Sequence, residues 1–281
     1  MKQVTESVYA ETGYKMPTVG CILTDEGAVL VDSPFLPSEA QDWRSKINSL
    51  TDKGIAYIIN TDWHFDHILG DCFLDGKVIA HQRSFRGFQN YLNRENMYGD
   101  IKMFFPKDFP KWQKELEPAR IVLPQIVFSD ELELHLGNKV IQLKFVGGHS
   151  PGTIWIYVPE DKVLFTGDNM EPRRHPGTTG AKFDSWLSLL RQAEEMDIDW
   201  IVPGHGEVSD KSLVTSTRQY FELMQQKVSE FKDRGASKEE TSAKVADYML
   251  DYFDYHNEEM DEDGHRWLLR TGAGRMYDQI G

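Results

Sequence analysis

The run TDWHFDH (residues 61–67) places four side chains that can bind a metal ion within six residues. The run directly follows the apolar stretch IAYIIN and precedes a segment that is typical of a helix. Its metal-binding side chains are Asp62, His64, Asp66 and His67. The first two are two residues apart, so in an extended loop they project the same way. The last two are adjacent and can diverge toward a second metal ion at the turn into a helix.

Three further candidates each follow an apolar run: His149 after IQLKFVGG, Asp168 after VLFTG and His205 after WIVPG. Taken singly, these residues fit a hydrogen-bonded structural histidine, a turn former and a loop histidine. Functional groups of α/β folds gather beyond the carboxyl ends of strands, and the flanking glycines allow close backbone approach. Four places where potential ligands follow a predicted strand favour a single metal site. Imidazole and carboxylate ligands suit Zn, Fe or Mn.

Short apolar runs separated by turn residues predict the strands that position these ligands. GCILTDEGAVLVDS (20–33) predicts a hairpin around Asp25-Glu26-Gly27, and a helix is predicted after Pro37, with apolar residues on one face. Further strands are predicted at 55–60 and 77–81, and in ELELHLG, KVIQLKFVGG, TIWIYVP, KVLFTGD and DWIVPGHG, with a helix near 184–196 before the last. The strands and helices together indicate an α/β fold.

Two stretches do not follow the strand pattern. Residues 84–120 are rich in aromatic and charged side chains, and we interpret them as a helical or irregular insertion that can overhang the site as a lid. An ordinary pair of surface helices is the alternative. From Asp210 onward apolar residues recur at helical spacing. The sequence therefore predicts one domain over 1–209 and a helical C-terminal extension over 210–281 packed on it.

The composition limits the classes of partner. With 31 basic and 45 acidic residues the net charge is −14, which argues against nucleic acid and against an anionic membrane. No apolar run approaches the roughly 20 residues of a spanning helix, and the start lacks the apolar core of a secretory signal. We expect a cytoplasmic protein with a small-molecule substrate and consider a homodimer contact. Cys21 and Cys72 are expected to be small buried hydrophobes.

Together these motifs resemble those of the metallo-β-lactamase superfamily. TDWHFDH is similar to its T-H-x-H-x-D-H signature, GGHSPGT to its second histidine motif, FTGD to the segment of its bridging aspartate and PGHG to its last histidine, in the same order over residues 8–207. The resemblance implies an αββα sandwich of two mixed sheets flanked by helices. It also implies that the first metal ion is held by His64 and His149, and the second by Asp66, His67 and His205, with Asp168 bridging both.

Asp62 departs from the family pattern, which has a histidine ligand of the first metal at this position. Aspartate can also be a ligand, with an oxygen at about 2.0–2.2 Å from zinc. It would make the metal a weaker Lewis acid and shift its preference toward Mn or Fe. Alternatively Asp62 turns away, which would leave the first site weak and the second dominant.

The resemblance implies a hydrolase with two divalent ions, zinc first and manganese or iron as alternatives. Ions about 3.5–4 Å apart would share a hydroxide that attacks a small ester, lactone, thioester or β-lactam-like substrate. Asp66 and Asp62 are the candidate catalytic residues, Asp66 by orienting or deprotonating the nucleophile. The alternatives are a non-haem iron enzyme of redox or oxygen chemistry and a non-catalytic binding protein with a degenerate metal site.

Candidate substrate-binding residues surround the ligands in the sequence. Trp63 and Phe65 either form a wall of the pocket or pack under the loop. The loop after Asp168 contains Arg173, Arg174 and His175, which either face an anionic substrate group or are solvated. The remaining histidines are expected to have other places: His81 a structural role, and His135, His256 and His265 positions facing solvent or capping helices.

Overall fold

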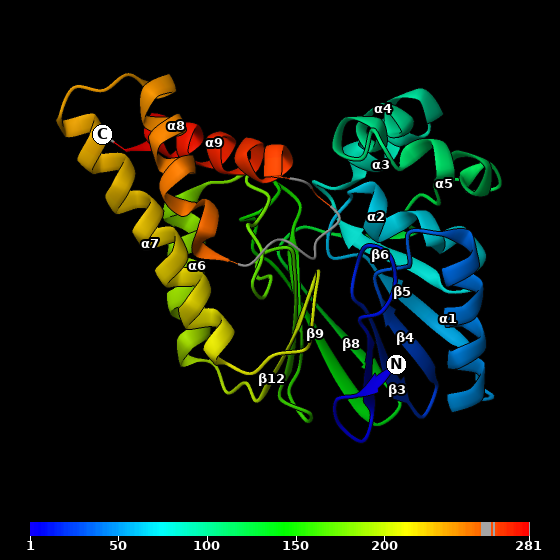
Figure 1. The fold of residues 1–281 in the computed structure, drawn as a ribbon. Coiled ribbons are helices and arrows are strands. Elements are labelled where there is room, and N and C mark those ends of the chain that lie inside the picture. Colours follow the sequence, from blue (N-terminus) through cyan, green and yellow to red (C-terminus); the bar gives the residue numbers. More distant parts are fainter. Residues whose placement is uncertain (254–259, 261, 281) are drawn as a thin grey trace.

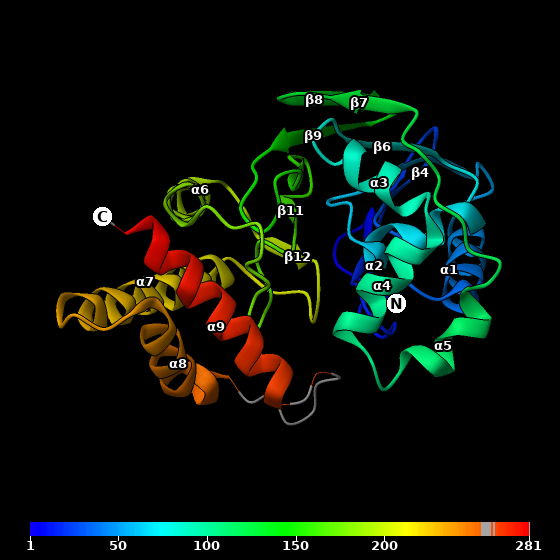
Figure 2. The same ribbon diagram turned by 90° about the horizontal axis from the view of Figure 1, so that it is seen from above.

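The structure is a computed structural model that describes residues 1–253, 260 and 262–280. These residues form two β-sheets that pack face to face, with helices on the outer faces of the sandwich (Figures 1 and 2). No helix among them combines the length and the hydrophobicity that crossing a bilayer requires.

Within the described residues, the first sheet has seven strands in the order β1 to β7. Their bounds are Lys2–Gln3, Val8–Glu11, Val19–Thr24, Gly27–Val31, Ile55–Ile59, Lys77–His81 and Ile126–Phe128. Strands β1 to β4 pair antiparallel, and β4 to β7 pair parallel. The predicted hairpin is the pair of β3 and β4, and the predicted strands after it are β5 and β6.

The second sheet has five strands among the described residues, in the order β12-β11-β10-β9-β8. Their bounds are Glu131–Leu136 (β8), Lys139–Phe145 (β9), Ile154–Val158 (β10), Val163–Gly167 (β11) and Trp200–Pro203 (β12). Only the pair of β11 and β12 is parallel within this described sheet. Both sheets are mixed, which confirms the predicted architecture.

Alternation along the strands divides the core into layers. Ile22 and Val29 point between the sheets, where they pack with Ile156 and Phe165 of the second sheet. Their neighbours Cys21 and Leu30 point outward and pack with Trp43 and Ile47 of α1 (Pro37–Leu50). Cys21 is a fully buried free thiol, as its apolar context predicted, whereas the free thiol Cys72 is only half-buried.

The stretch 84–120 is largely helical: α3 (Phe85–Tyr91), α4 (Arg94–Phe104) and α5 (Phe109–Leu116). These three helices stand above the end of the first sheet, next to α2 (Phe65–Ile68) and the 3₁₀ helix η1 (Leu69–Phe73) (Figure 1). They share a hydrophobic core with Phe35 and Phe65. The insertion is therefore packed onto the segment that carries the first metal-binding motif.

The outer face of the second sheet is covered by helices from the last part of the chain. Their bounds are Phe183–Glu195 (α6), Ser212–Asp233 (α7), Lys238–Met249 (α8), Leu250–Tyr252 (the 3₁₀ helix η2) and Glu262–Gln279 (α9). Tyr220, Met224 and Val228 of α7 are buried, as their spacing predicted. Helices α6 to α9 share one hydrophobic core with Trp155 and Leu164 of the sheet.

Candidate metal centre

All seven predicted ligands lie at one edge of the sandwich, each just beyond the end of a strand. Residues 62–67 follow β5 and enter the first turn of α2, and His149 follows β9. Asp168 comes directly after β11, and His205 lies two residues beyond β12. Six of the side chains gather in two groups, Asp62-His64-His149 and Asp66-His67-His205. Within each group the ligand atoms lie within 4.8 Å of one another.

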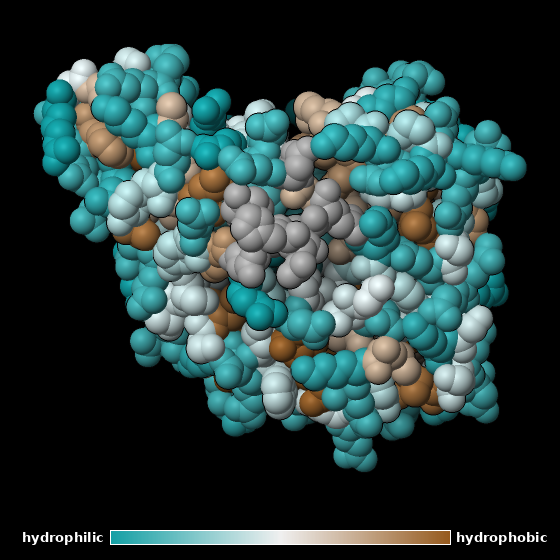
Figure 3. Space-filling view, in the orientation of Figure 1, coloured by the Kyte–Doolittle hydropathy of each residue, from teal (hydrophilic) through white to brown (hydrophobic). Residues whose placement is uncertain are grey.

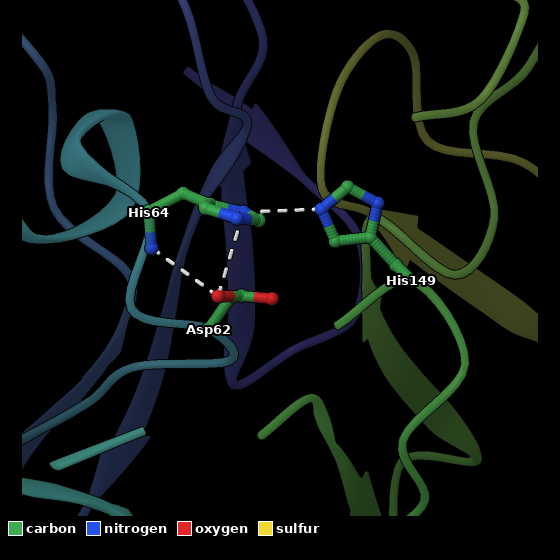
Figure 4. Close-up of side chains that lie close together, drawn as sticks. All are labelled: Asp62, His64 and His149. Carbon is green, nitrogen blue, oxygen red and sulfur yellow. Dashed lines mark hydrogen bonds and ion pairs between the residues drawn. The ribbon is translucent and has the colours of Figure 1, made fainter. Parts of the chain in front are cut away.

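The first group joins two loops across the edge of the sandwich (Figure 4). Nδ1 of His64 lies 3.0 Å from Nε2 of His149 and 3.5 Å from Oδ1 of Asp62. The second group is equally tight. Nε2 of His205 lies 3.2 Å from Oδ2 of Asp66, and Nε2 of His67 lies 3.6 Å from the same oxygen.

Asp168 lies between the two groups. Its Oδ1 is 3.2 Å from Nε2 of His67 and 3.5 Å from Nε2 of His205. Its Oδ2 is 3.5 Å from Nε2 of His149. A Cβ at Gly204 would lie 2.0 Å from Oδ1 of Asp168, so only glycine lets the chain after β12 pass this closely. One carboxylate therefore offers an oxygen to each group.

Hydrogen bonds on the far side of the rings orient three of the histidines. Nδ1 of His67 lies 2.9 Å from Oδ2 of Asp32. Nδ1 of His149 and of His205 lie 2.8 Å and 2.7 Å from the carbonyl oxygens of Gly177 and Met16. A histidine that donates from one nitrogen presents the other to a metal ion, and such partners fix the ring and the tautomer. In each of the three, Nε2 faces the centre.

Asp62 is fully buried and held by several donors. Its Oδ1 accepts hydrogen bonds from the backbone N–H groups of Trp63 and His64, and its Oδ2 accepts one at 3.0 Å from the hydroxyl of Thr153. Oδ1 nevertheless faces Nδ1 of His64. Asp62 thus shapes the ligand loop in addition to facing the first group.

The carboxylates make the centre strongly attractive to cations. Burial by itself would lower the pKa of His205, because it favours the neutral imidazole. The negative charge of Asp168 has the larger effect, and the pKa of His205 is raised to about 10. The pKa of His67 is likewise raised against the effect of burial, chiefly by Asp168 and Asp66. Burial opposes ionisation of Asp66, yet His67 and His205 lower its pKa to about 2. These imidazoles hold protons that a bound cation would replace.

The residues fit a pair of divalent ions. Nε2 of His67 and Oδ1 of Asp168 are buried and face each other at 3.2 Å, and neither has another hydrogen-bond partner among the described residues. A metal ion bound by both atoms would replace the proton that His67 holds here. The donor set of imidazole nitrogens and carboxylate oxygens suits Zn, Fe or Mn.

A cavity of about 610 Å³ opens onto both groups. Trp63 and Phe65 line it, and Trp63 is half-exposed whereas Phe65 is buried and also packs against Phe35. Arg174 lines the cavity too, with Nε 3.8 Å from Glu171. Glu171 is a further carboxylate of the cavity, and burial together with Asp168 raises its pKa.

The other predicted substrate-binding residues take different places. Arg173 is exposed, has a φ of 58°, and is not among the described residues that line the cavity. His175 lines the cavity but is buried, with Nδ1 3.0 Å from the hydroxyl of Tyr220 and Nε2 3.1 Å from the carbonyl of Leu250. Burial lowers the pKa of His175 to about 4, so it is a neutral residue that ties its loop to the C-terminal helices.

The remaining histidines are partly as expected. His81 is buried and stacks on Phe145, which fits the predicted structural role, and His135 is exposed. His265 does not face solvent, because it is 1% exposed and contacts the ring of His175, and its predicted capping role stays a prediction. His256 lies outside the described residues.

Two acidic residues of the centre were missed in the sequence. Asp32 closes the predicted hairpin and reads as a turn former, yet its carboxylate holds His67. Glu171 lies three residues beyond Asp168, in the loop that also contains Arg173 and Arg174. A usable signal existed for Asp32, since it directly follows a strand that ends at the site.

The profile of the metallo-beta-lactamase superfamily matches residues 15–205, which is more than half of the chain. The chain therefore belongs to the metallo-beta-lactamase superfamily and is a metallohydrolase of that superfamily. This confirms the resemblance of the four motifs.

Similar proteins include β-lactamases and sulfatases. Metallo-beta-lactamase type 2 of Bacteroides fragilis is 23% identical, over 73% of this chain and 75% of its own. Linear primary-alkylsulfatase of Pseudomonas sp. is 21% identical, over 65% of this chain and 40% of its own. The structure of the inverting sec-alkylsulfatase Pisa1 from Pseudomonas sp. matches with a TM-score of 0.72 and 16% identity, over 99% of this chain and 49% of its own. The structural match shows a shared fold.

Proposed function

We propose that this protein hydrolyses a small substrate with two divalent metal ions, zinc in the first place and manganese or iron as alternatives. The observation that carries the proposal is the position of Asp168. Its Oδ1 lies 3.2 Å from Nε2 of His67, and its Oδ2 lies 3.5 Å from Nε2 of His149. A carboxylate that reaches both groups supports a dinuclear site rather than a single ion.

Two bound ions would lower the pKa of water toward neutrality and polarise the reacting oxygen of the substrate. Asp66, with its pKa near 2, stays ionised and can accept a hydrogen bond that orients the attacking water. Asp62 is the second candidate for that role. The guanidinium of Arg174 in the cavity can bind an anionic group of the substrate.

The reacting group is proposed to be an ester, lactone, thioester or β-lactam-like amide. Attack on the carbonyl of such a group needs only a metal-activated water and a metal ion that polarises the carbonyl oxygen. A sulfate ester is the second candidate. The sec-alkylsulfatase structure covers 99% of this chain, which includes helices α7 to α9 beyond the region that the superfamily profile matches. Arg174 also suits a sulfate group.

The test combines metal analysis with a substrate panel. Purified protein and its Asp168→Ala variant would be analysed for metals by mass spectrometry and assayed with p-nitrophenyl acetate, a lactone, an acyl thioester, nitrocefin and an alkyl sulfate. About two ions per chain and chelator-sensitive turnover support the proposal. Bound iron with charge-transfer bands would support redox chemistry instead, and bound metal without any turnover would support a binding protein.

A further inference from the structure

The cavity at the metal centre has one polar end and one apolar wall. Its polar end is formed by the metal-binding residues together with Glu171 and Arg174. The side that Trp63 and the insertion form is mostly aromatic and apolar, with Trp63, Tyr91, Met103, Phe104 and Phe105. The rings of Trp63 and Tyr91 lie 5.5 Å apart, so the wall begins directly beside the ligand His64.

The wall is fixed by packing. Trp63 rests on Gly87 of α3, where an added Cβ would lie 2.1 Å from the indole ring. The hydroxyl of Tyr91 donates a hydrogen bond of 2.7 Å to Asp100, which keeps the ring in place. Phe105 packs against Trp112 of α5, with ring centroids 5.6 Å apart. Such a wall is formed before the substrate binds, which lowers the entropic cost of binding.

A second cavity of about 350 Å³ lies next to this wall and is lined by both apolar and charged residues. Met103, Phe104 and Phe105 line both cavities, and Trp267 of α9 lines the second. Phe104 and Trp267 meet with ring centroids 5.7 Å apart, so the insertion touches the C-terminal helices here. Figure 3 shows the surface hollowed between these two groups of helices. The side chains of Met103 and Trp267 are 60% and 40% exposed, so the wall continues to the surface of the molecule.

We propose that this wall is a subsite for an apolar chain of the substrate, whose hydrolysable group lies at the metal centre. The inference rests on the proposed function and narrows it to amphiphilic esters. The polar end of the cavity matches the reacting group, and the apolar wall matches the chain.

The test is a series of p-nitrophenyl acetate, butyrate and octanoate. For wild type, kcat/KM is expected to rise about fourfold for each methylene group that becomes buried. Phe104→Gln should lower kcat/KM for the octanoate about tenfold and leave the acetate unchanged. Met103→Gln, at an exposed position that tolerates substitution, should give a smaller loss of the same kind. Equal kcat/KM across the series in wild type would overturn the subsite.

The matched control is Leu92→Gln. Leu92 is another exposed apolar residue of the insertion, 57% exposed, and is not among the described residues that line either cavity. Leu92→Gln should leave the chain-length dependence as in wild type. If Leu92→Gln lowers kcat/KM for the octanoate as much as Met103→Gln does, the effect does not depend on contact with the cavity. That outcome would overturn the subsite.

A binding measurement separates the subsite from the proposed function. Calorimetric titration with octanoate and butyrate needs no turnover. Tighter binding of octanoate that is weakened by Phe104→Gln supports the subsite even when no ester is hydrolysed, and in that case only the hydrolase proposal fails. Ester turnover combined with equal affinity for the two acids would overturn the subsite and leave the hydrolase proposal intact.

Discussion

Oδ2 of Asp32 lies 2.9 Å from Nδ1 of His67, on the side of the ring that faces away from the metal centre. The same carboxylate accepts hydrogen bonds from the backbone N–H and the hydroxyl of Thr61, each at 2.7 Å. Asp32 adopts a φ of 58° to reach this position, a conformation that is unusual outside glycine. A single buried aspartate therefore ties the end of β4, the loop after β5 and a ligand ring together.

We expect Asp32→Asn to weaken metal binding about 10-fold to 100-fold, because partners of this kind orient the ligand and raise its basicity. Competition with a chromophoric chelator measures the affinity. Asp75→Asn is the matched control, since the side chain of Asp75 is 67% exposed and pairs with Arg44 at the surface. Equal affinities of wild type and Asp32→Asn would show that His67 does not depend on this contact.

Asp168→Ala is expected to lower the metal content and reduce hydrolysis to background, because it removes an oxygen from both groups at once. Elemental analysis and the substrate panel measure the two effects. The control is Asp197→Ala, whose carboxylate is 74% exposed. Full activity in Asp168→Ala would exclude the bridging role.

Substitutions at Asp62 distinguish its two roles. If Asp62 is a ligand, Asp62→Ala should lower the metal content from about two ions per chain to about one, and Asp62→His should tighten zinc binding in the first group. Asp62→Ala should also cost about 1–3 kcal/mol of stability, since Thr153 and two backbone N–H groups lose a buried acceptor. Elemental analysis and denaturant unfolding separate these effects. Unchanged metal stoichiometry with lowered stability would leave Asp62 a structural residue.

The ligands could be predicted from the sequence because their signals are local. The apolar run of β11 is buried along its whole length, so the polar residue that follows it had to lie at the end of the sheet. The same reasoning placed His205 after β12. Four motifs in order then identified the fold, and the alternating burial of β3 and β4 follows from their alternating side chains.

The contacts that depend on packing could not be predicted. Asp32 and His67 are 35 residues apart, and their contact requires the parallel register that pairs Val31 with Ile59. The burial of His265 requires α9 to pack against the loop that contains His175. Strand β7, with three residues, is too short to give a periodic signal.

The metal-free protein should lose stability at both ends of the pH range. The pKa of folded His205 is about 10, above its ordinary value of 6.5, so its contribution is complete below pH 6.5 and is lost as the pH rises toward 10. The pKa of folded Asp66 is about 2, below its ordinary value of 3.8, so its contribution is complete above pH 3.8 and is lost as the pH falls toward 2. Thermal unfolding in a chelator across this range measures both. A bound metal ion should remove the loss at high pH, because the ligands no longer need protons.

Arg174 and Arg173 are adjacent in the sequence but differ in their relation to the cavity, so Arg173 can serve as the control for Arg174. Arg174 lines the cavity, whereas Arg173 is exposed. Arg174→Gln should raise KM about tenfold for substrates with an anionic group, because a hydrogen bond to a charged group is worth about 1.5–3 kcal/mol. It should leave KM for neutral esters and the metal content unchanged. Arg173→Gln should behave as wild type with both kinds of substrate. An equal rise in KM for anionic and neutral substrates would assign Arg174 to the shape of the loop, through its contact with Glu171, rather than to charge recognition.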